Sequence, residues 1–425
     1  MESCCIEQFL EGKTIFITGV TGYLAKILSE KILRVQPNVK KLYLLIRAPD
    51  SNLAKQRFNN EVIKTDLFGV LREKLGTNLH GFIEDKVFPV VGDIDCDSLG
   101  INSELKDEMF REIDIIVNSA ATTRFDERYD TAIRTNVLGA LHVLNFSKQC
   151  SKLMMLLHVS TGQARLHGWA NTYSFTKSMG EMLLGHLKED LQLIILRPTI
   201  ILSTYKEPFP GWIEGMRTTD TFIVGYGKGK QKVAMGGRDT IIDVIPADMV
   251  VNSVIAAMVA HRNPSSRTTV YHISSSRRNQ IKIDDFIQNG VDYFKKNPWI
   301  DERGKPVKVK QFHLLDSMDS LHKYIAIHYM PSLKILKWAN FMLCRHLQVQ
   351  HTNLQRRINH AIRLAELYKP YVFFKGIFDD TNAEMLRMAT RESNADDTFN
   401  FDPTTIQWDK YLKETHIPGL VKYIF

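Results

Sequence analysis

Lys13-Thr-Ile-Phe-Ile-Thr18 and the turn after it, Gly19-Val-Thr-Gly-Tyr-Leu-Ala25, decide the fold. The first run is short and apolar, as in a buried strand, and residues 23–35 carry the apolar spacing of a helix. Both glycines therefore fall in a strand-to-helix turn, where the N–H groups of the helix terminus can bind a pyrophosphate. This arrangement predicts a binding site for a dinucleotide cofactor.

The cofactor contacts predicted in this turn come from Thr18, Gly19, Thr21, Gly22, Tyr23 and Leu24. The spacing of the two glycines and Ala25 departs from the usual glycine fingerprint of dinucleotide sites. It resembles the wider turn of extended short-chain dehydrogenase/reductases. Because glycines after any strand also serve as plain turn residues, the cofactor assignment depends on the rest of the chain.

The second predicted strand, residues 41–46, ends at Arg47. An acidic residue here would accept hydrogen bonds from a free ribose 2′-hydroxyl, whereas a cation suits a 2′-phosphate. Arg47 therefore predicts NADPH as the cofactor. Lys55 and Arg57 fit further phosphate contacts and a solvated basic helix equally well.

Further apolar runs predict strands at residues 87–91, 113–117, 154–159, 193–200 and 269–273. Their alternation with helices predicts an α/β fold: a Rossmann-type doubly wound parallel sheet, followed by a smaller, mainly helical C-terminal domain.

Two polar residues near these strands are assigned to the cofactor site. Asp93 follows the strand 87–91 and is predicted either to hold the adenine amino group or to stabilise a turn. Asn136 is expected at the start of a helix, where a proton relay and a simple capping role are both open.

Tyr173-Ser-Phe-Thr-Lys177 supplies the predicted proton chemistry. Residues four apart share one face of a helix, so the Lys177 ammonium can hold the Tyr173 pKa below its usual value of about 10. Such a phenol can protonate an alkoxide. Ser160 and Thr161, at the carboxyl end of the strand 154–159, are predicted to polarise a substrate carbonyl, although such hydroxyls often only cap.

Two other polar residues receive structural roles. His158 is expected to pack within its strand rather than act as a base, and Arg197 is expected to brace the corner that it forms with Pro198.

Five longer strings narrow the relationship: Tyr205-Lys-Glu-Pro-Phe-Pro-Gly-Trp-Ile-Glu-Gly215, Tyr226-Gly-Lys-Gly229, Asp243-Val-Ile-Pro-Ala-Asp248, Tyr368-Lys-Pro-Tyr-Val-Phe-Phe374 and Ile417-Pro-Gly-Leu-Val-Lys-Tyr423. With them, the chain resembles the plant alcohol-forming fatty acyl-CoA reductases from about Phe9 to its last residues. The resemblance implies two successive NADPH reductions of a long-chain acyl-CoA to a primary fatty alcohol, with CoA released, in wax- or suberin-type lipid metabolism. It also implies that Lys177 binds the nicotinamide ribose.

The chain departs from that family between the Ser-Thr strand end and the Tyr-x-x-x-Lys helix. Plant members usually carry a long segment there, but here only residues 162–172 lie between them. We expect this shortening to impair binding of the substrate rather than proton transfer. It favours, as an alternative, a catalytically impaired NADPH-binding paralogue that acts as a partner or regulator. A sugar-nucleotide epimerase or dehydratase would hold NAD, and Arg47 disfavours it.

The length of 425 residues exceeds one ordinary core, and a polar stretch at residues 274–280 comes after the last predicted strand. We therefore expect an NADPH-binding domain at residues 1–275 and a C-terminal domain at residues 280–425. Five cysteines without paired spacing indicate no metal site. The net charge of +8 favours anionic partners such as CoA, NADPH and acidic lipids, and its dispersed charges disfavour nucleic acid.

No signal or transit peptide is visible at the amino terminus, so a cytoplasmic location is expected. Residues 324–347 read as an amphipathic helix pair with a basic face. Packing of that face in the C-terminal domain is favoured over membrane contact, and peripheral contact with the endoplasmic reticulum is kept as the alternative.

Overall fold

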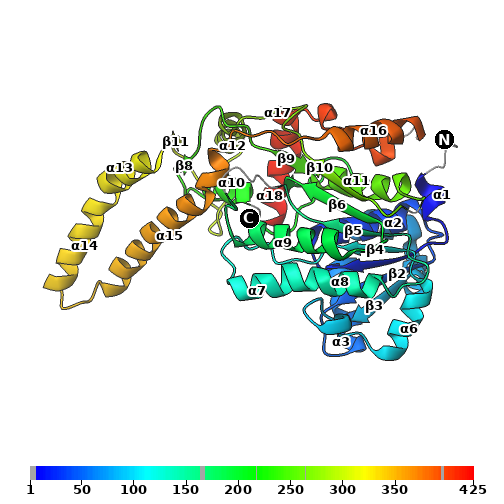
Figure 1. Ribbon diagram of the computed structural model, residues 1–425. Helices are drawn as coiled ribbons and strands as arrows, with labels where there is room; N and C mark the ends of the chain where they lie inside the picture. Colours follow the sequence, from blue (N-terminus) through cyan, green and yellow to red (C-terminus); the bar gives the residue numbers. More distant parts are fainter. Residues whose placement is uncertain (1–5, 163–167, 217, 264, 394–396) are drawn as a thin grey trace. The chain divides into compact units, whose positions relative to one another are not determined.

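A seven-stranded parallel sheet forms the centre of unit 1, one of two units into which the chain divides (Figure 1). The computed structural model describes residues 6–162, 168–216, 218–263, 265–393 and 397–425. Unit 1 comprises Met1–Arg217, Asp243–Asn279 and Phe378–Phe425, and unit 2 comprises Thr218–Ile242 and Gln280–Ile377.

The strand order of the large sheet is β10-β6-β5-β4-β1-β2-β3, and every neighbouring pair is parallel. This order confirms the predicted Rossmann-type sheet. Its strands are β1 (Thr14–Thr18), β2 (Lys41–Ile46), β3 (Val87–Val91), β4 (Ile115–Asn118), β5 (Met155–Val159), β6 (Leu193–Pro198) and β10 (Thr268–Ile273). The pair β7 (Ile200–Leu202) and β9 (Val244–Pro246) lies outside it.

The strand order changes direction at β1. Strands β2 and β3 are added on one side of β1, and β4, β5, β6 and β10 are added on the other. Every residue of β1 is buried, because the strand is covered on both faces and paired on both edges. The register places Thr18 opposite Asn118, so the carboxyl ends of both strands meet at the switch point where such sheets bind ligands.

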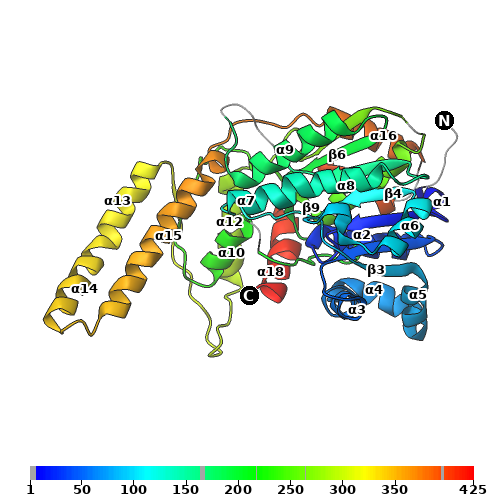
Figure 2. The same cartoon turned by 60° about the horizontal axis from the view of Figure 1, so that its bottom comes forward.

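Helices cover both faces of the sheet in Figures 1 and 2. Helices α2 and α11 pack against each other, and α8 packs against α9. The α-helices of unit 1 are α1 (Ile6–Leu10), α2 (Tyr23–Val35), α3 (Ser51–Phe58), α4 (Gly69–Leu75), α5 (Leu79–Lys86), α6 (Ser103–Glu112), α7 (Tyr129–Ile133), α8 (Gly139–Ser147), α9 (Thr172–Leu187), α11 (Ala247–Ala260), α16 (Thr381–Ser393), α17 (Trp408–Tyr411) and α18 (Ile417–Tyr423).

The expected helix start at Asn136 is wrong. The helix begins at Tyr129, and a π-helical turn, Arg134–Leu138, joins α7 directly to α8. Asn136 is therefore inside a continuous helical segment and does not cap it.

Unit 2 contains α10 (Thr218–Gly227), α12 (Ile283–Lys296), α13 (Met318–His328), α14 (Met330–Met342) and α15 (Gln348–Val372), with a parallel pair of short strands, β8 (Val233–Met235) and β11 (His313–Leu315). Within the described ranges, no helix combines the length and the apolar character needed to cross a bilayer.

The chain enters unit 2 twice, and its last residues group with unit 1. The boundary predicted near residues 275–280 coincides with the second entry. Residues 378–425 rejoin unit 1 because α16 packs on α11 and the Asn382 amide donates to the Val270 carbonyl of β10. The division into two consecutive domains, residues 1–275 and 280–425, stays a prediction, because the two units group the contacts in a different way.

Candidate active site

The glycine turn brings the ends of β1 and β4 into contact. Gly19 has φ +76°, and a Cβ there would lie 2.8 Å from backbone atoms of Ala120. A larger residue would therefore be excluded by both conformation and space. The Thr18 hydroxyl accepts the N–H groups of Ser119 and Ala120 at 3.1 Å and donates to Asn118 Oδ1 at 2.8 Å.

The first turn of α2 has no side-chain cap for its N–H groups. Gly22 is its exposed N-cap residue. Uncapped N–H groups at a helix start attract anions. Thr21 and Leu24 are half-buried beside it. Tyr23 instead turns its side chain inward: it stacks on Trp212, and its hydroxyl donates to the carbonyl oxygens of Leu202 and Trp212.

Arg47 and Asp93 come after neighbouring strands, since β2 pairs with β3 up to Ile46 and Val91. The Arg47 side chain is exposed directly after β2. Asp93 is half-buried, and its Oδ1 accepts the N–H of Asp95 at 3.0 Å. The turn role that the sequence offered for Asp93 is therefore present in the structure.

Asn136 is buried and makes three hydrogen bonds within the protein. Its Oδ1 accepts the Thr122 N–H at 3.0 Å, and its Nδ2 donates to the Thr122 carbonyl and to Thr176 Oγ1. Thr176 lies on α9 between Tyr173 and Lys177. Asn136 thus links the segment after β4 to the helix that carries the predicted catalytic pair.

The α9 helix presents Tyr173 in its first turn and Lys177 in the next. It begins where Asn171 Oδ1 accepts the Ser174 N–H, a standard N-cap. Tyr173 is half-buried and stacks on Phe125 with ring centroids 5.9 Å apart. The Lys177 Nζ is buried and donates to the Val159 carbonyl at 2.7 Å, so α9 is tied to the end of β5.

Burial lowers the pKa of Lys177 to about 8, against the opposing attraction of the Glu181 carboxylate. Glu181 itself is held by Arg197, whose Nε donates to Glu181 Oε2 at 2.9 Å. Arg197 thus ties the end of β6 to α9 and fixes the charge that lies one turn beyond Lys177; its bracing of the corner at Pro198 stays a prediction.

A series of buried polar contacts that sequence reasoning missed ends at Lys177. Asn118 Nδ2 lies 3.1 Å from His158 Nδ1, and His158 Nε2 lies 3.4 Å from Lys177 Nζ. Because the single Thr18 hydroxyl proton goes to Asn118 Oδ1, the Asn118 amide must donate to His158 Nδ1. Burial and the Lys177 charge lower the His158 pKa well below its usual value. His158 is therefore uncharged at neutral pH.

Ser160 and Thr161 come after β5, next to this lysine. Ser160 is 3% exposed, and its Oγ has no hydrogen-bond partner within the described part of the chain. Such a hydroxyl is rare in a folded protein and is suited to a bound ligand. Thr161 is half-buried. Residues 163–167 of the shortened segment lie outside the described residues.

A cavity of about 170 Å³ lies elsewhere in unit 1 and includes none of the predicted site residues. Its lining is Tyr205, Lys206, Glu207, Asp248, Met249, Asn252, Thr398 and Asn400. Nowhere among the residues that the structure describes do three His, Cys, Asp or Glu side chains gather as a metal site would need.

Two family models, both described as "Male sterility protein", match residues 17–168 with 162–254 and residues 327–425. Fatty acyl-CoA reductase 1 of Arabidopsis thaliana is 44% identical over 489 aligned positions, covering 100% of this chain and 99% of the relative. This chain belongs to the fatty acyl-CoA reductase family. The alcohol-forming fatty acyl-CoA reductase of Simmondsia chinensis is 42% identical, covering 99% of this chain and 98% of the relative.

The family comparison also locates the departure noted in the sequence. The first model matches in two stretches that overlap at residues 162–168, and the Arabidopsis alignment is longer than this family member's 425 residues. The segment between β5 and α9 is therefore shortened relative to the family. The N-terminal part is an NAD(P)-binding Rossmann domain.

Among solved structures, the terminal R domain of the myxalamid PKS-NRPS pathway matches with a TM-score of 0.64. It is 19% identical, and the match covers 97% of this reductase-family chain and 91% of the other. At this identity the likeness concerns the fold.

Proposed function

We propose that this protein reduces long-chain fatty acyl-CoA to primary fatty alcohol with NADPH. The observation that carries the proposal is Lys177 anchored at the end of β5, with Tyr173 one turn before it, in a chain related over its full length to fatty acyl-CoA reductases. Bound NADPH supplies the hydride for each of the two reductions.

The protein's own groups would act on the substrate oxygen. Ser160 and Thr161 would donate hydrogen bonds to the thioester carbonyl as negative charge develops on it. The first reduction expels CoA thiolate and leaves an aldehyde. In the second, the Tyr173 hydroxyl gives its proton to the alkoxide, and Lys177 stabilises the resulting phenolate. The alcohol then carries the two hydrides and that proton.

The residues present fit the cofactor. The uncapped start of α2 would hold the pyrophosphate. Lys177 would bind the nicotinamide ribose, and Arg47 would contact the 2′-phosphate.

The defining experiment supplies the purified protein with NADPH and acyl-CoA of graded chain length and identifies the extracted products by mass spectrometry. Primary alcohol is the expected product. NADPH binding without alcohol or aldehyde would instead support the alternative of a binding partner or regulator, for which the shortened segment at residues 162–172 is the motivating observation.

Replacing Arg47 by Ala should raise the KM for NADPH about tenfold or more and leave the KM for NADH almost unchanged. A charge-assisted hydrogen bond contributes about 1.5 to 3 kcal/mol, and 1.4 kcal/mol corresponds to a factor of ten. Steady-state kinetics with both cofactors measures the difference. Lys64→Ala is the control, because Lys64 is also an exposed cation and its ammonium donates to Asn60. Equal losses with NADPH and NADH would remove Arg47 from the 2′-phosphate site.

Peripheral contact with a membrane is part of this proposal, since the acyl chain of the substrate is a lipid tail. An enzyme that contacts the surface of the endoplasmic reticulum would combine the expected cytoplasmic location with access to this lipid tail.

A further inference from the structure

Helices α13, α14 and α15 form a helical hairpin in unit 2, which we call the arm (Figures 1 and 2). Its core lies in the half near β8 and β11, where Met235, Leu321, Ile325, Leu333 and Ile358 pack together. The other end, residues 334–349, contains the turn between α14 and α15, and we call it the tip.

The tip exposes large apolar side chains. Trp338 is 71% exposed, and Phe341 and Met342 are each 76% exposed. Ile335 and Trp338 are three residues apart and therefore share a face of α14, while Leu333 and Asn340 are buried toward the rest of the arm. Leu343 and Val349 extend the exposed apolar surface across the turn. Clusters of this kind on a protein surface mark interaction sites.

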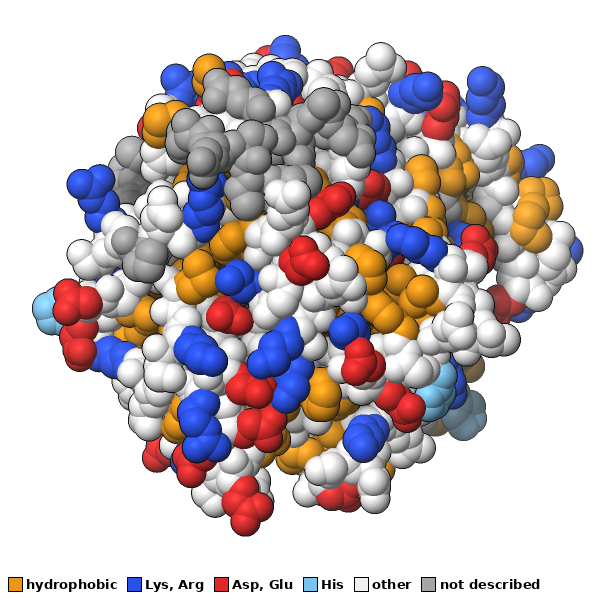
Figure 3. Space-filling view, turned by 90° about the vertical axis from the view of Figure 1, so that its right-hand side faces the viewer, with side chains coloured by type: hydrophobic (Ala, Val, Ile, Leu, Met, Phe, Trp, Pro, Cys, Tyr) orange, Lys and Arg blue, Asp and Glu red, His pale blue; other side chains and the backbone are white. Residues whose placement is uncertain are grey.

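Within the arm, the stretch from residue 320 to residue 365 carries charge of one sign only. Residues 320–365 contain seven Lys or Arg and no Asp or Glu, although the whole chain has 55 basic and 47 acidic residues. All seven are exposed: Lys323, Lys334, Lys337, Arg345, Arg356, Arg357 and Arg363. By contrast, the face of unit 1 in Figure 3 intersperses Lys and Arg with Asp and Glu. The single-sign stretch of the arm differs in this respect from that face.

We propose that the tip of the arm docks on a membrane surface that carries anionic headgroups. The exposed apolar residues of α14 would enter the boundary between headgroups and acyl chains, and Lys334, Lys337 and Arg345 would lie at the level of the phosphates. This combination selects a lipid surface: a nucleic acid would use the charge but not the apolar side chains, and a second copy would bring like charges together. The inference deepens the proposed function and rests on it, because it places the enzyme where its lipid substrate is found.

The test is flotation of the full-length protein with vesicles of phosphatidylcholine, alone or with about a third phosphatidylserine, in the absence of NADPH and acyl-CoA. We expect binding to the anionic vesicles that weakens with salt. The double variant Trp338→Ser with Phe341→Ser should lower the bound fraction at least tenfold, and Lys334→Glu with Lys337→Glu should abolish the preference for phosphatidylserine. Met182→Ser with Met388→Ser is the control, since these residues are 56% and 55% exposed in unit 1.

Absence of vesicle binding, or equal binding by the tip variant and the control, would overturn the proposal. A change in oligomeric state caused by the tip variant alone, with vesicle binding intact, would assign the surface to a second copy and would also overturn it. Turnover of detergent-solubilised acyl-CoA should stay within twofold of the parent in every tip variant. That readout separates failure of docking from failure of the proposed reductase function.

Discussion

Replacing Tyr173 by Phe is expected to lower alcohol formation by about 10²- to 10⁴-fold, the range typical of a lost general acid. The ring can still stack on Phe125, so α9 should keep its place and NADPH should still bind. Turnover is lost because the alkoxide no longer receives a proton from a group held beside Lys177. NADPH oxidation by absorbance and cofactor binding by fluorescence measure the two quantities on the same samples.

Tyr129→Phe is the matched control for this change. Tyr129 lies on α7, is 52% exposed and stacks on Phe175 of α9. It should keep near-parental turnover, because it has no place in the proposed proton transfer. If both variants lost turnover equally, the effect would come from packing around α9, and Tyr173 would lose its role. If Tyr173→Phe kept the parental turnover, the alternative of a binding partner or regulator would be favoured.

The strands of the sheet could be predicted because buried parallel strands leave continuous apolar runs in the sequence. The runs at residues 41–46 and 87–91 match β2 and β3, and residues 23–35 match α2. Spacing also placed Tyr173 and Lys177 on one helix, since four residues make about one turn.

Features that the sequence did not reveal depend on contacts between distant segments. The approach of Asn118 to His158 results from the parallel pairing of β4 with β5, which sets these residues opposite each other. No local pattern reports that pairing. The inward orientation of the Tyr23 side chain could not be predicted either, because the carbonyl groups that accept its hydroxyl proton, those of Leu202 and Trp212, are far along the chain. Asn136 was misplaced because Asn is a favoured N-cap residue type, and its hydrogen bonds to Thr122 and Thr176 cannot be seen in the local sequence.

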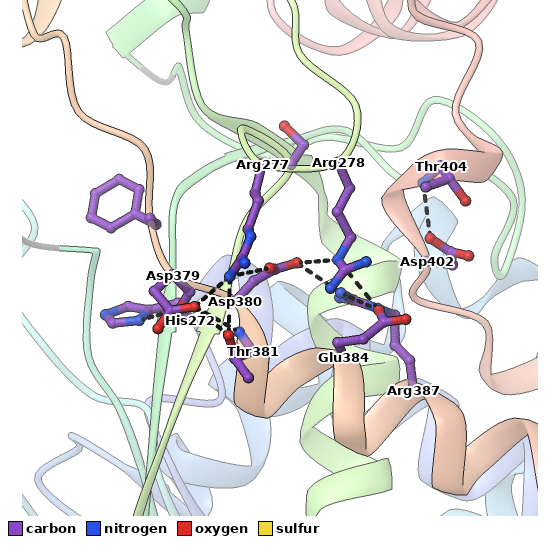
Figure 4. A network of polar contacts seen from close by, with 12 residues as sticks. His272, Arg277, Arg278, Asp379, Asp380, Thr381, Glu384, Arg387, Asp402 and Thr404 are labelled. Atoms are coloured by element: carbon purple, nitrogen blue, oxygen red, sulfur yellow. Dashed lines mark hydrogen bonds and ion pairs between the residues drawn. The ribbon is translucent and has the colours of Figure 1, made fainter.

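A buried carboxylate, Asp380, links residues 378–425 to the rest of unit 1, and this predicts the second large effect. Figure 4 shows Arg278 and Arg387 converging on Asp380 just before α16. Arg278 Nε donates to Asp380 Oδ2 at 2.8 Å, and an Arg387 N–H donates to the same oxygen at 2.7 Å. Asp380 has no exposed side-chain surface, and Arg387 is 3% exposed.

Asp380→Asn should lower the free energy of unfolding by about 1.5 to 3 kcal/mol, because it removes the buried carboxylate that accepts charge-assisted hydrogen bonds from both arginines, while Glu384 still pairs with Arg387. The amide has nearly the shape of the carboxylate, so the change isolates charge from packing. Urea unfolding followed by fluorescence measures the loss. Asp379→Asn is the control: Asp379 also bonds to an arginine, Arg277, but it is 74% exposed and water screens the pair.

A small effect of Asp379→Asn beside a large one of Asp380→Asn would locate the stabilising interaction in the buried carboxylate. Equal small effects would mean that apolar packing of α16 on α11, rather than the charge network, holds the C-terminal segment in unit 1. The distinction matters for the active site. The network joins α16 to the segment that follows β10. Strand β10 pairs with β6, and Arg197 is a residue of β6. Arg197 in turn holds Glu181 one turn beyond Lys177 on α9, so loosening of the C-terminal segment has a direct structural route to Lys177.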